Sequence, residues 1–240
     1  RNLDGHKPPV AMPSFDRRTL GTLPTSHWRD IMIKLYGAPL SNYYNMVKTA
    51  LLEKGIEFEA VMTPPSQEDD YRAKSPMGKI PCIETDDGFL AESIPILNYL
   101  EDTHPEPALL PSDAFSRAKV RELAQSLELH VELVARRGFG ALRGNEVPND
   151  VKEGIKSDLT KGIGAIKRLA KFSPWIAGDE FTYADLVGYF TFTLGNRSAQ
   201  LNADMDLFAD MPGAKEWFEK VAARDSVKQA EADQAASRRG

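Results

Sequence analysis

Apolar and polar positions near the start of the chain follow first a strand-like and then a helix-like spacing. Residues 31–36 form a short apolar run that ends at a glycine and a proline, and residues 56–62 alternate apolar and polar side chains. Both patterns are typical of β-strands. Between them, apolar positions one helical turn apart lead to Gly55, with Ser41 as a candidate N-cap. We therefore expect a strand, a helix and a second strand.

The next segment predicts a second group of elements. Residues 63–74 are polar and contain two adjacent prolines, which indicates a loop with at most a short helix. Two strand candidates, residues 80–84 and 88–91, flank an Asp-Asp-Gly turn and are expected to pair antiparallel. A helix is predicted over residues 94–101, because Pro95 would lie in its first turn, where no backbone hydrogen bond is lost.

Beyond a proline-bounded linker at residues 105–111, the pattern is helical throughout. One apolar stripe at helical spacing covers residues 120–131, and another covers residues 217–222. Thr182 and Asp185 match a helix N-terminal capping pattern, which favours a structural over a catalytic role for this carboxylate.

These patterns predict two domains and an extension. A mixed α/β domain is expected at residues 31–106 and an all-α domain at residues 112–240. Residues 1–30 contain four prolines and few periodic apolar positions, which favours an extended arm. We expect this N-terminal extension to lie against the protein's own surface or a sister subunit.

The composition narrows the class of partner. Lys and Arg total 30 and Asp and Glu total 35, and the net charge of −5 disfavours nucleic-acid or membrane binding. Cys82 is the only cysteine, so no intrachain disulfide can form and a reducing compartment is expected. The chain has no apolar run of about 18 residues, and its opening stretch lacks the apolar core of a secretory signal. We therefore expect a cytoplasmic protein.

Ser41 is the first candidate for chemistry, since it lies between the first predicted strand and helix. A hydroxyl at a helix N-terminus can donate a hydrogen bond to an anion, which the helix dipole also favours. The alternative is that Ser41 only caps the helix.

Two further short segments are candidates for ligand contacts. In Ile80-Pro81 the proline directly precedes a strand-forming run, and a cis bond would turn the preceding backbone toward an extended ligand. The alternative is a plain edge-strand proline. Glu92-Ser93 begins the next predicted helix and offers a carboxylate for a ligand ammonium group and a hydroxyl for a ligand carboxylate, or else only a cap.

In order and separation, these segments resemble the glutathione S-transferase family. Residues 35–41, with Val47 six positions after the serine, are similar to the start of the serine-type classes, theta and phi especially. Residues 75–81 resemble the loop before the family's cis-proline, residues 90–93 resemble its γ-glutamyl site, and residues 177–185 resemble its capping motif.

The resemblance implies a thioredoxin-like α/β N-terminal domain, an all-α C-terminal helical domain, and a homodimer that binds glutathione at the domain junction. Glutathione would be a co-substrate, and no metal is expected. The backbone of Ile80 would pair with the cysteinyl part, and Ser41 would face the sulfur. The full set of implied glutathione contacts is Lys79, Ile80, Pro81, Glu92 and Ser93. The stretch 63–70 departs from the family, because it is acidic where serine-type members commonly place basic residues for the glycyl carboxylate.

The implied role of Ser41 is to stabilise a thiolate. A thiol with a pKa of about 8.5 is only a few per cent ionised at neutral pH, and lowering this pKa by one unit requires about 1.4 kcal/mol. A charge-assisted hydrogen bond contributes roughly 1.5–3 kcal/mol, so one hydroxyl at a helix N-terminus is sufficient. Tyr36 is the rival donor, but its spacing to Val47 fits the serine alignment less well, so we assign it to the strand core.

The predicted function is conjugation of the glutathione thiolate to small electrophilic or halogenated organic compounds, as in detoxification. Leu40, Tyr44 and His130 are expected to line the pocket for this second substrate. A glutathione-dependent isomerase or disulfide reductase is one alternative, and a catalytically silent module for protein association is another. Cys82 follows Pro81 in an apolar run and is expected to be a buried, inert thiol.

Overall fold

A computed structural model of the protein describes residues 32–238. The N-terminal extension predicted for residues 1–30 lies outside this range. Within the described residues no helix is both long enough and apolar enough to span a bilayer.

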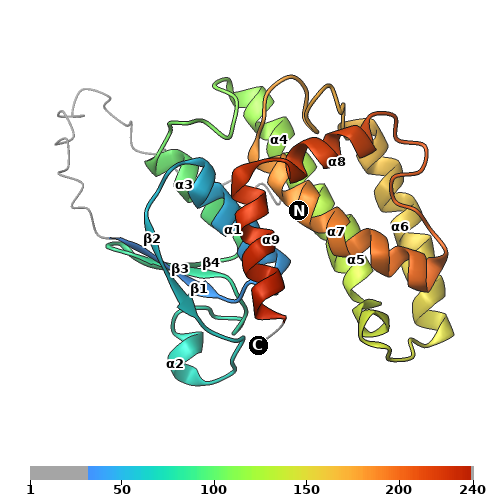
Figure 1. Ribbon diagram of the computed structural model, residues 1–240, viewed down its shortest axis with the longest axis horizontal. Coiled ribbons are helices and arrows are strands. Elements are labelled where there is room, and N and C mark those ends of the chain that lie inside the picture. Colours follow the sequence, from blue (N-terminus) through green and yellow to red (C-terminus); the bar gives the residue numbers. More distant parts are fainter. Residues whose placement is uncertain (1–31, 239–240) are drawn as a thin grey trace, which may run out of the picture. The chain divides into compact units, whose positions relative to one another are not determined.

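The first part of the described chain is built on a four-stranded mixed sheet (Figure 1). Its strands are β1 (Ile33–Gly37), β2 (Phe58–Met62), β3 (Cys82–Thr85) and β4 (Gly88–Ala91), in the order β2-β1-β3-β4. β1 and β2 are parallel, and β1, β3 and β4 pair antiparallel in turn. The predicted strand–helix–strand start and the later hairpin are both present.

Three helices accompany the sheet: α1 (Asn42–Glu53), α2 (Asp69–Arg72) and α3 (Ser93–Thr103). Figure 1 shows α1 and α3 on one side of the sheet and α2 on the other. Ile33 and Leu35 of β1 are buried in the same core as Leu51 of α1 and Leu100 of α3, because alternate strand residues face the helices. The predicted loop at residues 63–74 contains the short α2, as expected.

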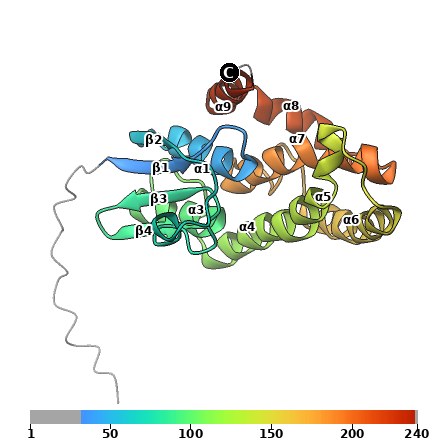
Figure 2. The same ribbon diagram turned by 90° about the horizontal axis from the view of Figure 1, so that it is seen from below.

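The rest of the described chain is helical, as predicted. Its α-helices are α4 (Ala114–Leu127), α5 (Leu133–Arg136), α6 (Asn149–Leu169), α7 (Tyr183–Ala203), α8 (Ala214–Ala222) and α9 (Asp225–Ser237). Helix α7 contacts α1, α4, α5, α6 and α8 and is buried along most of its length, so it is the central helix of this part (Figure 2). Thr182 and Asp185 form the predicted capping box at its start. The Asp185 carboxylate also accepts hydrogen bonds from the Trp217 indole at 2.7 Å and the Ile176 amide at 2.8 Å.

One departure from the predicted pattern is a π-helical turn, Glu128–Glu132, between α4 and α5. The apolar stripe at residues 120–131 follows regular α-helical spacing, whereas the π turn shifts the phase of every residue that follows. Helix α6 packs closely against this turn at Gly162, where an added Cβ would lie 2.2 Å from the His130 carbonyl oxygen. A glycine at this position therefore accommodates the turn.

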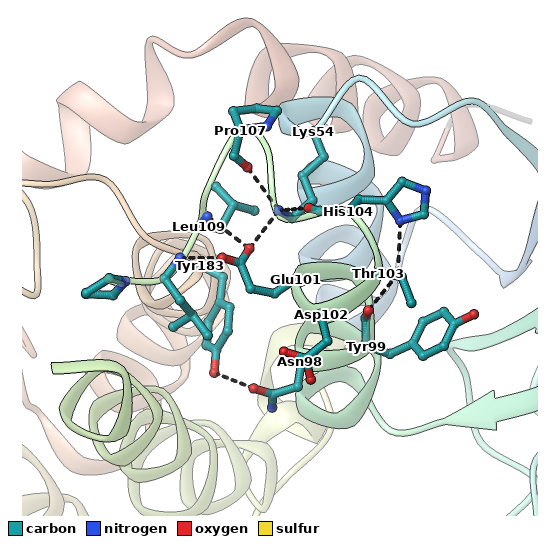
Figure 3. Close-up of polar contacts among 12 residues, drawn as sticks. Lys54, Asn98, Tyr99, Glu101, Asp102, Thr103, His104, Pro107, Leu109 and Tyr183 are labelled. Carbon is teal, nitrogen blue, oxygen red and sulfur yellow. Dashed lines mark hydrogen bonds and ion pairs between the residues drawn. The ribbon is translucent and has the colours of Figure 1, made fainter. Parts of the chain in front are cut away.

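A buried ion pair within the sheet part holds the linker that leads to the helical part (Figure 3). The Lys54 ammonium, at the end of α1, lies 2.6 Å from the Glu101 carboxylate on α3, and the two side chains are 1% and 2% exposed. Lys54 also donates to the carbonyl of Pro107, and Glu101 accepts from the amide of Leu109. These bonds fix the linker that leads from α3 to α4.

Candidate functional site

A cavity of about 1090 Å³ lies where the sheet part meets the helical part. Its sheet-side wall comes mainly from the β1–α1 loop, the segment before β3 and the start of α3. Its helical wall comes from the π turn, α5 and the segment that follows it, α7, and the residue after α9. It brings together residues that the sequence singled out in separate motifs: Leu40, Ser41, Lys79, Ile80, Pro81, Glu92 and Ser93.

Ser41 lies on the cavity wall at the N-terminus of α1. Its Oγ accepts a hydrogen bond from the Tyr44 amide at 3.3 Å, so the capping interpretation is correct. A hydroxyl has two lone pairs and one hydrogen, and capping through a lone pair does not use the hydrogen. The positive end of the helix dipole is directed to the same place. Ser41 can therefore cap the helix and donate to an anion in the cavity at once.

The loop before β3 is held by its own hydrogen bonds. The Lys79 carbonyl accepts from the Ser75 hydroxyl at 2.7 Å, and the Ile80–Pro81 peptide bond is cis. Gly78 has φ of +64°, and an added Cβ there would lie 2.2 Å from the Ser66 carbonyl oxygen. A side chain at position 78 would thus displace the loop, which explains the glycine.

Glu92 and Ser93 form a corner of the cavity at the start of α3. Glu92 has φ of +70°, a conformation that few residues other than glycine adopt, and its side chain makes no capping bond. The Ser93 hydroxyl is buried and has no hydrogen-bond partner among residues 32–238. The plain-cap interpretation therefore does not account for either side chain. Buried polar groups normally have partners, so an unpartnered hydroxyl in a cavity wall points to a ligand.

A second carboxylate, Glu128, approaches this corner from the helical wall. Burial raises the pKa of Glu128, and the negative charge of Glu92 raises it further. Two carboxylates that repel one another across a cavity favour a cation between them. An ammonium group is the ligand that this corner suits.

Basic side chains lie among the apolar residues of the helical wall. Arg136, Arg143 and Arg197 line the cavity there. The Arg136 guanidinium lies 4.7 Å from the centre of the Tyr43 ring and 5.1 Å from that of Phe139, within the range of cation–π contacts. These arginines can bind anionic groups that enter the cavity.

Behind Arg136 lies Glu132, a carboxylate that is wholly buried. It accepts from an Arg136 guanidinium nitrogen at 2.9 Å and from the Asn42 side-chain amide at 3.2 Å. Burial raises the pKa of Glu132 to about 7, although Arg136 and Asn42 act in the opposite direction. Asn42 follows Ser41 and also donates to the Phe190 carbonyl at 2.8 Å, so this cluster connects the start of α1 to α7.

Comparison with known proteins identifies the family. A model of the glutathione S-transferase N-terminal domain matches residues 35–108, and a model of the C-terminal domain matches residues 144–233. A glutathione S-transferase of Pseudomonas putida is 42% identical over 86% of this chain and 94% of its own length. This chain belongs to the glutathione S-transferase family. The prediction that it is an enzyme of this family, a glutathione S-transferase, is confirmed.

Other relatives widen the comparison. The maleylacetoacetate isomerase of Dictyostelium discoideum is 29% identical over 58% of this chain and 68% of its own length. Among solved structures, a glutathione S-transferase of Rhodospirillum rubrum has a TM-score of 0.67 and 28% identity, and covers 83% of this chain and 91% of its own. One from Methylobacterium radiotolerans, in complex with glutathione sulfonate, has a TM-score of 0.65 and 25% identity, over 83% of this chain and 94% of its own. The predicted fold class, a thioredoxin-like domain followed by a helical domain, is confirmed.

Two of the residues predicted for the second-substrate pocket of this glutathione S-transferase lie elsewhere. Tyr44 is 1% exposed and belongs to the core, where its ring packs against Gly37. His130 is exposed on the π turn, outside the cavity lining. Leu40 does line the cavity, and Tyr43 lines it instead of Tyr44. The errors arose because the facing of a helical residue depends on packing and on the phase of the helix.

Tyr36, the rival thiolate donor, is not part of the cavity lining, and its hydroxyl forms a hydrogen bond elsewhere. Its hydroxyl donates to the Glu84 carboxylate on β3 at 2.5 Å, and this bond, with burial, raises the pKa of Tyr36 to about 12. Tyr36 is half-buried rather than fully in the strand core. Cys82 is a buried thiol as expected, and burial raises its pKa to about 11.

The sequence interpretation missed Arg136, Glu132 and Glu128. Arg136 lies four residues after Glu132, a spacing that would have suggested an ion pair on one helix face. Nothing in the sequence indicated that the pair lies at the cavity, because that depends on the π turn. In the acidic stretch 63–70, Pro64 and Pro65 line the cavity edge, while the carboxylates at positions 68–70 are exposed.

Proposed function

We propose that this enzyme binds glutathione in the cavity and conjugates its thiolate to small electrophilic or halogenated compounds, with Ser41 as the thiolate donor. The position of Ser41 supports this proposal most directly: its hydroxyl lies on the cavity wall at the positive end of α1. In this proposal the chain is of the serine type, as in theta and phi transferases.

The cavity wall provides a partner for each part of the tripeptide. The γ-glutamyl ammonium group fits between Glu92 and Glu128. The buried Ser93 hydroxyl, which has no partner among the described residues, can donate to the carboxylate of the same γ-glutamyl group. The backbone of Ile80, beside Pro81, takes the cysteinyl part. Lys79 lies exposed on the same wall and serves the glycyl carboxylate.

The test is a titration of the bound thiol in wild-type enzyme and in Ser41→Ala, followed by the ultraviolet absorbance of the thiolate. We expect the wild-type thiol pKa to lie one or two units below about 8.5, and the variant pKa to return toward that value. Since about 1.4 kcal/mol corresponds to one unit, kcat/KM at neutral pH should fall about tenfold or more.

The matched control is Ser157→Ala, an exposed serine of α6 outside the cavity lining, which should behave as wild type. A Ser41→Ala enzyme with an unchanged thiol pKa would remove Ser41 from this role. Calorimetry on the wild-type protein addresses the silent-module alternative, because a module of that kind is expected to bind no glutathione.

A second candidate function is glutathione-dependent isomerisation of a substrate that carries carboxylates. This function is favoured by the arginines that line the cavity and by relatives named maleylacetoacetate isomerase. Arg136, Arg143 and Arg197 would hold the carboxylates, since guanidinium groups bind them in bidentate fashion. Turnover of a maleyl substrate without consumption of glutathione would favour this function over conjugation. A disulfide reductase is less well supported, because position 41 is serine and the thiol of Cys82 is buried.

We also retain the predictions of a homodimer and of a cytoplasmic location. The predicted domain limits, residues 31–106 and 112–240, place the domain boundary in the linker that Lys54 and Glu101 fix. Light scattering coupled to size-exclusion chromatography tests the dimer, since a dimer has twice the chain mass of 26.6 kDa.

A further inference from the structure

The π turn Glu128–Glu132 holds a carboxylate, Glu132, that is buried behind a residue of the cavity wall. Glu132 is 0% exposed and shares its charge between the Arg136 guanidinium, at 2.9 Å, and the Asn42 amide, at 3.2 Å. π-helical turns inside α-helices occur frequently at functional sites. The close fit of Gly162 against this turn shows that the neighbouring helix is matched to it.

Arg136 lies between this buried carboxylate and the cavity. Its side chain is 35% exposed, and it lines the cavity between the Tyr43 and Phe139 rings. The guanidinium has five N–H donors in a plane, and one of its terminal nitrogens is used by Glu132. Arg136 is therefore positioned to bind an anion that enters the cavity.

We propose that Glu132 and Arg136 form a proton-linked anion site: an anionic group of the second substrate draws the Arg136 charge away from Glu132, and Glu132 then takes up a proton. This inference rests on the proposed function, because the anion enters beside bound glutathione. It makes Glu132 a positioning residue whose charge sets the preference of the pocket for anionic over neutral substrates.

The burial of Glu132 accounts for the proton uptake. An ionised carboxylate that loses its counter-ion in a buried site is strongly destabilised and becomes protonated instead. Its pKa is already raised to about 7 with Arg136 in place, and it must rise further when an anion neutralises Arg136. Anion binding should therefore strengthen as the pH falls through this range, because protonated Glu132 no longer competes for the guanidinium.

Other ionisable groups near Glu132 do not offer a simpler explanation. His130, on the same turn, is exposed and lies outside the cavity lining. Glu128, on the same turn, raises the pKa of Glu132 only as a minor contribution. Tyr43, from α1, has a pKa raised by burial and by both carboxylates, so it stays neutral. Helices α4, α6 and α7 also contact the turn, and none of their ionisable groups is among the main influences on this pKa.

The experiment compares two thioether ligands, S-methylglutathione and S-carboxymethylglutathione, by calorimetry from about pH 5.5 to about pH 8.5, a range that brackets the Glu132 pKa. Neither ligand has a free thiol, and the added carboxylate stays ionised across this range. Groups common to both ligands cancel in the ratio of their dissociation constants. We expect the wild-type preference for the carboxymethyl ligand to increase about tenfold as the pH falls.

Three variants separate the contributions of Glu132 and Arg136 to the ligand preference. Glu132→Gln should show a strong preference for the carboxymethyl ligand at every pH, because the competing charge is gone. Arg136→Gln should show only a weak preference for the carboxymethyl ligand at every pH. The matched control is Glu122→Gln, an exposed glutamate of α4, which should keep the wild-type pH dependence.

The outcomes distinguish the two proposals. If both ligands bind and the wild-type preference does not change with pH, the proton-linked site is refuted while the proposed function stands. If neither ligand binds, the proposed function itself fails. Should Glu132→Gln not fold, the wild-type profile and the Arg136→Gln variant still decide the question.

Discussion

Replacing Lys54 by methionine is expected to destabilise the protein by about 4 kcal/mol, because it leaves the Glu101 carboxylate buried without its counter-ion. Breaking a buried ion pair from one side typically costs 3–5 kcal/mol. Glu101 would keep its bonds from the Leu109 and Leu110 amides at 3.0 and 3.2 Å, which limits the penalty. The carbonyls of His104 and Pro107 would lose a donor at 2.7 and 2.9 Å, which adds to it.

The assay is urea unfolding followed by tryptophan fluorescence, with the free energy obtained by linear extrapolation. A loss of about 4 kcal/mol corresponds to a fall in Tm of about 8–16 °C for a chain of this size. The matched control is Lys161→Met, because Lys161 is 77% exposed and its ion pair with Asp158 should contribute less than about 1 kcal/mol.

A double variant tests the reason for the loss. Adding Glu101→Gln to Lys54→Met removes the uncompensated charge, so the double variant should be more stable than Lys54→Met alone. The reasoning would be refuted if Lys54→Met cost less than about 1 kcal/mol, or if the second substitution destabilised the protein further.

Three other substitutions and one control have expected outcomes. Ser93→Ala removes a buried hydroxyl that has no partner among the described residues, so it should raise stability by about 1 kcal/mol in thermal unfolding. It should also weaken glutathione binding in calorimetry about tenfold, and a loss of stability would contradict this account. Asp185→Asn should cost about 3 kcal/mol in urea unfolding, because its new amide would face donors such as the Trp217 indole. The control Asp179→Asn, at an exposed position, should leave the free energy of unfolding unchanged. Gly162→Ala should cost about 1–3 kcal/mol through its clash with the π turn, and an unchanged urea midpoint would show that the turn yields easily.

Local patterns were enough to predict most of the elements. The capping box at Thr182 and Asp185 could be predicted because both partners lie within one helical turn. Ser41, Ile80 and Glu92 could be grouped only through the resemblance to the glutathione S-transferase family, since each feature alone also fits a plain cap or an edge-strand proline. A capping signal depends only on residues that are close together in the sequence, so it can be identified from the sequence alone.

The helical wall of the site could not be predicted in the same way. Assigning Tyr44 and His130 to the pocket required knowledge of which helix faces turn inward, and this is decided by packing against distant segments. The π turn is an example: its inserted residue is accommodated by Gly162, more than thirty positions after Glu128. A periodic apolar pattern contains no information about such a contact.

Two of the buried carboxylates, Glu101 and Glu132, show how similar groups acquire different roles in one chain. Glu101 accepts from two backbone amides and pairs with a lysine that is itself 1% exposed, so its counter-ion has no access to a ligand. Glu132 pairs with an arginine whose side chain is 35% exposed to the cavity, so its counter-ion can be drawn away. Burial makes an unpaired charge unfavourable in both cases. The accessibility of the counter-ion therefore decides that Glu101 serves only stability, whereas Glu132 can respond to the substrate.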